Sequence, residues 1–157
     1  MGRKRWRLGL VVVAGLLFGA GTYWFAPWKL VVDERVAEAA PAAPRVIAGG
    51  LFRGLEHETS GGAMVLESGG GLMLRLEDLR TSNGPDLAVI LSPTAASEDS
   101  WTEYGQGDIV VLGALKGNLG SQNYTLPAGI ELGRYRSAVI WCRRFHVAFG
   151  AAPLSAR

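Results

Sequence analysis

The chain contains one cysteine, Cys142, and this side chain has the greatest capacity for redox or nucleophilic chemistry. A thiolate attacks electrophiles and binds metals, and nearby arginines favour it over the neutral thiol. Arg143 and Arg144 follow Cys142 directly, and Trp141 precedes it. A free cysteine is often only a small buried hydrophobic residue, and the surrounding residues by themselves favour this inert role. A single thiol excludes an intramolecular disulfide, a CxxC pair and a cysteine-rich zinc site.

His57, which stands between two glutamates, is the second candidate for chemistry. Such a histidine suits a metal ligand or a base, but side chains alternate between faces in an extended segment, so we expect a solvated loop. His146 follows Cys142 by four residues, about 13 Å along a strand, so the two meet only if the chain reverses between them. The sequence contains no nucleophile elbow, phosphate-binding loop, dinucleotide fingerprint or HExxH helix, so we assign no metal-ligand residues and do not expect a stand-alone enzyme.

Short apolar segments with a period of two dominate the chain after residue 46. Hydrophobic and polar residues alternate from Leu72 to Glu77, and other apolar segments lie at 87–91, 109–112, 139–142 and 145–149. Glycine, asparagine and proline clusters separate them. About eight short strands at this spacing predict an all-β domain, an antiparallel β-sandwich or barrel, over residues 46–157. The longest segment without strand character, 92–107, contains Trp101 and Tyr104.

Residues 8–25 form an uncharged segment that predicts a membrane anchor. A helix of this length spans roughly 27 Å, close to the thickness of a hydrocarbon core. A cleaved signal peptide is the alternative, but Phe18 occupies a position before the best cleavage site that requires a small residue. We therefore predict an uncleaved single-pass anchor within residues 1–28, followed by an alanine- and proline-rich linker, residues 29–45. A GxxxG pair, Gly15 and Gly19, would permit helix dimerisation, but the oligomeric state stays undetermined.

The net charge of +2 is concentrated at the N-terminus. Four basic residues precede the apolar segment: Arg3, Lys4, Arg5 and Arg7. The positive-inside rule then places the N-terminus in the cytoplasm and the β-domain in the periplasm or outside the cell. The other 12 basic residues are outnumbered by 14 acidic ones, which excludes a basic surface for nucleic acid.

A series of short motifs occurs in a characteristic order over residues 46–154. The motifs are Phe52, His57–Gly61, Gly84–Leu87, Leu112–Gly117, Gln122–Pro127, Val139–Phe149 with its Trp-Cys pair, and Phe149–Ala152. Their order resembles the DM-thirteen domain family. The most specific block is Trp-Cys-x-x-Phe-x-Val-x-Phe, and Leu79 stands where the family pattern leads us to expect an aromatic residue.

The resemblance implies an extracytoplasmic β-domain for electron transfer, of a kind found in some proteins beside DOMON and cytochrome-type domains. Cys142 matches the family's shared cysteine, its proposed redox residue. On this hypothesis Trp141 shapes the thiol pocket, Arg143 or Arg144 stabilises a thiolate, and His57 is a further supporting candidate. The cofactor is unknown, with haem and metal both open. A redox protein partner or a cofactor is required because one thiol cannot complete a dithiol cycle alone.

The alternative hypothesis is a binding or adhesion module without catalytic activity. A β-sandwich surface would then present the segment with Trp101 and Tyr104 to a glycan or a protein. This interpretation predicts that Trp101 is exposed and that modification of Cys142 is harmless.

Overall fold

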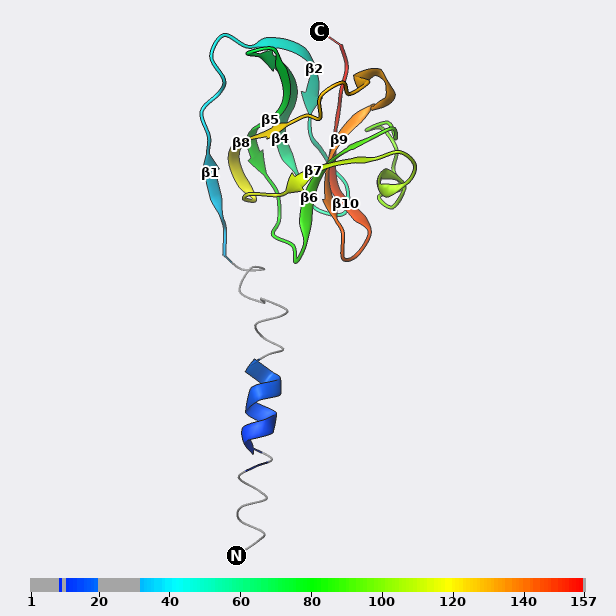
Figure 1. The fold of residues 1–157 in the computed structure, drawn as a ribbon. Helices are drawn as coiled ribbons and strands as arrows, with labels where there is room; N and C mark the ends of the chain where they lie inside the picture. The colour runs from blue at the N-terminus through cyan, green and yellow to red at the C-terminus, as the bar shows by residue number, and fades with distance from the viewer. Residues whose placement is uncertain (1–8, 10, 20–31, 157) are drawn as a thin grey trace, which may run out of the picture.

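A computed structural model describes residue 9 and residues 11–19 and 32–156 (Figure 1). Residues 9 and 11–19 are helical, whereas part of the predicted anchor, including residues 20–25, lies outside the described residues. Among the residues described, no helix is long and apolar enough to cross a membrane.

The domain consists of two five-stranded β-sheets that pack against each other (Figure 1). In spatial order, the first sheet contains β1 (Arg35–Ala37), β8 (Leu119–Thr125), β5 (Gly71–Arg80), β4 (Ser60–Ser68) and β2 (Arg45–Leu51). The second sheet contains β3 (Arg53–Gly54), β10 (Val147–Pro153), β9 (Ser137–Cys142), β6 (Leu87–Ser92) and β7 (Val110–Ala114). Two 3₁₀-helices, η2 (Glu103–Gly105) and η3 (Leu132–Arg134), lie in the connections.

This architecture confirms the predicted all-β class and identifies the sandwich, rather than the closed barrel, as the observed form. The described residues form ten strands instead of about eight, because β1 and β3 are too short to produce a periodic pattern. The described strand pairs are antiparallel except β1 and β8, which run parallel.

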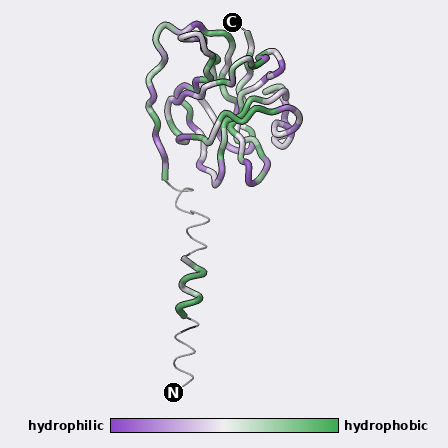
Figure 2. Tube along the Cα trace, in the orientation of Figure 1, coloured by the Kyte–Doolittle hydropathy of each residue, from purple (hydrophilic) through white to green (hydrophobic). Residues whose placement is uncertain are grey.

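The central strands of the second sheet, β6 and β9, are buried on both faces, which explains their continuous apolar segments. Along β9, Ala138, Ile140 and Cys142 belong to the main core between the sheets. Val139 and Trp141 belong to a second, outer cluster with Tyr104. The segment 93–109 therefore covers the outer face of this sheet, and Figure 2 shows the hydrophobic chain concentrated in the middle of the domain.

The segment predicted as a linker contains β1, which pairs with β8 at the edge of the first sheet. Gly120 in β8 permits this pairing, because its φ is +96° and a Cβ there would collide with the Val36 carbonyl oxygen. The pairing satisfies backbone groups on this edge of the sheet and attaches part of the N-terminal segment to the domain.

Glu38 fixes the end of this attachment, and its ionisation gives a testable pH dependence. Its carboxylate accepts hydrogen bonds from Lys116 Nζ and the Asn123 N–H, both at 2.7 Å. The Lys116 contact and then the Asn123 contact lower the pKa of Glu38 below its ordinary 4.5. The stabilisation is therefore present above pH 4.5 and is lost as the pH falls through the lower, folded-state pKa.

We expect hydrogen-exchange protection of residues 35–38 to decrease below about pH 4.5 in the wild type. In a Glu38→Gln protein this pH dependence should disappear, because the titrating group is absent. Glu67→Gln is the matched control, since the Glu67 ion pair with Arg45 lies at the opposite edge of the sheet. An unaltered acid response in Glu38→Gln would show that another group controls the docking of β1.

Candidate functional site

Cys142 is the last residue of β9, and its side chain is 0% exposed. It pairs with Leu87 of β6 on one side and with Val147 of β10 on the other. The thiol therefore lies in the main core, between the two sheets and at one end of the second sheet. This placement means that the thiol has no direct contact with solvent or with a macromolecular partner while the domain is closed.

Trp141 lies on the opposite face of the sheet from Cys142, as the alternation of side chains along a strand requires. Its ring packs in the outer cluster against η2, where a Cβ on Gly105 would overlap with it. Only 5% of Trp141 is exposed. The predicted role of Trp141 as a wall of the thiol pocket thus does not agree with this arrangement, and the residue closes the outer face instead.

Arg143 makes an ion pair with Asp86 rather than reaching back to the thiol. Its Nη2 and Nε atoms donate to Asp86 Oδ1 at 2.6 and 3.1 Å, and its backbone N–H donates to the Asp86 carbonyl at 3.0 Å. We call this contact the Asp86–Arg143 clasp. It joins the turn after β9 to the turn before β6, directly beside Cys142. The spacing of 57 residues left no local signal for it in the sequence.

The chain does reverse after Cys142, as a meeting with His146 requires, through a tight turn at residues 143–146. His146 has a φ of 54° and is exposed. Its ring contacts the edge of Trp141, with 6.4 Å between ring centroids. The reversal therefore brings His146 to Trp141 on the outer side of the sheet. Arg144 is exposed in the same turn.

His57 is half-buried rather than fully solvated. Its ring stacks on Phe149, with centroids 3.8 Å apart and planes at 34°. Phe149 belongs to the same core cluster as Cys142, so His57 covers one edge of that core. Sequence reasoning missed this contact because the two residues come from distant parts of the chain.

The surroundings of Cys142 do not fit a haem or a metal ion at the thiol. In the described part of the chain, no three His, Cys, Asp or Glu side chains are grouped so that they could hold a metal. The thiol is fully enclosed by hydrophobic packing, and a macrocycle would require several hundred Å³ of free space beside it. The chemistry available at this site is therefore that of the thiol itself.

Of the two aromatic candidates in the 93–109 segment, one is buried and the other is exposed. Tyr104 is fully buried, and its hydroxyl donates to the Glu98 carbonyl at 2.8 Å. Burial raises the pKa of Tyr104. Arg53 fixes the segment by donating to Asp99 at 2.7 Å and to the Glu98 carbonyl at 2.6 Å. Trp101 stays 45% exposed, so it alone is available for a binding surface.

The comparison with protein families decides what kind of domain this is. Residues 51–154 match the family model described as Electron transfer DM13. The chain belongs to this family. The resemblance to the DM-thirteen family is thereby confirmed, and the matched range contains Cys142 and every described strand of the second sheet. Comparisons with curated proteins and with solved structures found no match.

Proposed function

We propose that this DM-thirteen protein is a membrane-tethered, extracytoplasmic electron-transfer module that uses the thiol of Cys142. The family match supports the electron-transfer role. The position of Cys142 supports its assignment as the redox group. It is the only cysteine, and it lies at a strand end rather than in the middle of the sheet.

A buried thiol requires a route to its reaction partner. We expect this route to open at the Asp86–Arg143 clasp, directly beside Cys142. Both partners of the clasp are partly exposed, and exposed ion pairs contribute at most about 1 kcal/mol. The two turns can therefore separate locally without global unfolding. We infer that opening of this end of the sandwich exposes Cys142, and that closing protects it again.

The chemistry at the opened site needs a second sulfur from a partner. Joining Cys142 to a partner thiol forms one S–S bond, and the two protons and two electrons released reduce a second disulfide of the partner to two thiols. The chain has one cysteine and cannot close this cycle internally. A redox protein partner is consequently part of the proposal.

The N-terminal sequence supports the tether and the location. Eighteen uncharged residues follow a basic tip, a pattern typical of an anchor whose N-terminus stays in the cytoplasm. The domain would then stand outside the reducing cytoplasm, where thiol oxidation persists.

The function is tested on the full chain purified from membranes in air, by absorption spectrum and intact mass before and after reduction. We expect a reducible adduct or oxidised thiol in the wild type and its loss in Cys142→Ser. Ile140→Val is the matched control, because Ile140 occupies the same core face of β9 and the change costs only about 0.5–1.5 kcal/mol.

The binding-module alternative is favoured by one observation, the exposure of Trp101. It predicts the opposite pattern in the same preparations. Cys142→Ser would leave every redox signal and every partner contact intact, whereas Trp101→Ala would weaken partner capture. That pair of results would overturn the redox assignment.

A further inference from the structure

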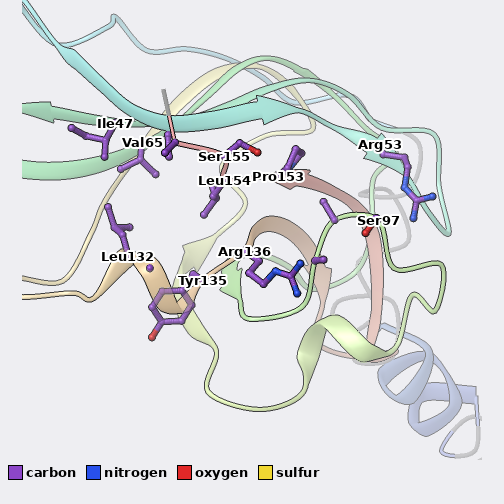
Figure 3. Close-up of a pocket in the computed structure, with 15 residues that line it drawn as sticks. Ile47, Arg53, Val65, Ser97, Leu132, Tyr135, Arg136, Pro153, Leu154 and Ser155 are labelled. Atoms are coloured by element: carbon purple, nitrogen blue, oxygen red, sulfur yellow. The ribbon is translucent and has the colours of Figure 1, made fainter.

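A cavity of about 730 Å³ opens at the end of the sandwich where β10 finishes (Figure 3). Its walls come from both sheets and from the η3 region. Hydrophobic side chains form most of its lining, among them Ile47, Val65, Leu132 and Leu154. Figure 3 shows these four gathered on one side of the cavity. A space of this size and character falls in the range of small-molecule sites, about 300–1,000 Å³.

The charged lining of this cavity is entirely basic. Two arginines, Arg53 and Arg136, line it, and among residues 32–156 no Asp or Glu does. Arg53 is already neutralised by Asp99 at 2.7 Å. Arg136 is exposed, and within residues 32–156 its guanidinium makes no ion pair. In Figure 3 the guanidinium extends away from the apolar side chains toward Ser97. The cavity thus has an apolar end and an end at Arg136, which also borders an adjacent pocket lined by Glu98 and Glu103.

We propose that this cavity binds an amphipathic monocarboxylate, with its carboxylate on Arg136 and its hydrocarbon chain against Ile47, Leu132 and Leu154. The planar guanidinium matches a carboxylate in charge and in hydrogen-bond geometry. The apolar walls remove the chain from water, which is the dominant contribution for such a ligand. A neutral alcohol of the same length would bury the same chain but would leave Arg136 unpaired.

This site is independent of the proposed redox site. Arg136 immediately precedes β9, whereas Cys142 ends that strand, which places the two residues about 20 Å apart along β9. Loss of the thiol would therefore leave carboxylate binding intact, and loss of Arg136 would leave the thiol chemistry intact.

The test uses the full chain in phosphatidylcholine nanodiscs and a dodecanoate probe with a photoreactive diazirine at its far end. We expect saturable labelling of peptides that contain Ile47 or Leu132, with competition by dodecanoate. Arg136→Gln should raise the half-saturating concentration about fivefold, because it removes a charge-assisted interaction with an exposed arginine. Arg134→Gln is the matched control, since Arg134 pairs with Asp108 and lies outside the lining.

A second variant separates binding in the cavity from partition onto the protein surface. Leu132 lines the cavity and is only partly buried, so Leu132→Glu places a carboxylate against the apolar chain of the ligand and should abolish the labelling. The proposal is overturned if Arg136→Gln labels like the wild type, if dodecanol competes as well as dodecanoate, or if labelling survives in Leu132→Glu. Circular dichroism of each variant verifies that the sandwich is retained.

Discussion

Cys142 in the folded chain is expected to react with N-ethylmaleimide at least about a thousandfold more slowly than in the chain unfolded by guanidinium. The side chain is completely buried, so the reagent reaches it only in the open fraction of molecules. An opening free energy of about 4 kcal/mol already corresponds to this factor. The rate is measured by intact mass at intervals after addition of the reagent.

Two variants of the chain test where the domain opens. Ser82→Cys, made in a Cys142→Ser background, places a thiol at an exposed position and should react at the unprotected rate. Asp86→Asn weakens the Asp86–Arg143 clasp and should accelerate the reaction of Cys142 up to about fivefold, the limit that an exposed ion pair sets. Equal rates in folded and unfolded wild type would show that Cys142 is not buried and would remove the need for a gated route.

Trp141→Ala is expected to lower the free energy of unfolding by about 3–5 kcal/mol. The ring is almost fully buried in the outer cluster and packs against η2, so its removal leaves a cavity under the 93–109 segment. Urea denaturation monitored by circular dichroism measures the change. The effect identifies Trp141 as a structural residue of the outer face.

Phe145→Ala provides the comparison for this result. Phe145 lies in the turn after β9 and is 63% exposed, so its truncation should change the free energy of unfolding by no more than about 0.5 kcal/mol. If Trp141→Ala lowered the free energy of unfolding as little as Phe145→Ala, the outer cluster would not be a second core.

The fold class was predictable because hydrophobic alternation is a local property. Leu74 and Leu76 are fully buried in β5, as their period-two spacing indicates. The same criterion fails for β9, where both faces are apolar and neither can be assigned to the inside from the pattern. The outer face is buried only because the 93–109 segment folds over it, and this depends on contacts between distant residues.

The candidate site, too, could be predicted from the sequence only in part. Its cysteine could be identified from residue type and from the family resemblance, but not the face of the sheet on which it lies. The clasp joins positions 57 residues apart, and His57 meets Phe149 across most of the domain. Such contacts are fixed by strand order and register, which a single sequence does not encode in any short pattern.

Coulometric titration of the full chain tests the central claim most directly, because it counts the electrons that each protein exchanges. Wild-type protein and Ile140→Val, each mixed with an equal amount of a small thiol as the partner sulfur, are titrated beside Cys142→Ser. In wild type and in Ile140→Val, we predict that each disulfide formed between Cys142 and the small thiol releases two electrons. The count should therefore reach about two electrons per chain at completion. The Cys142→Ser protein mixed with the same amount of small thiol should exchange only as many electrons as the small thiol without protein. The same electron count in all three proteins would contradict an electron-transfer role for Cys142.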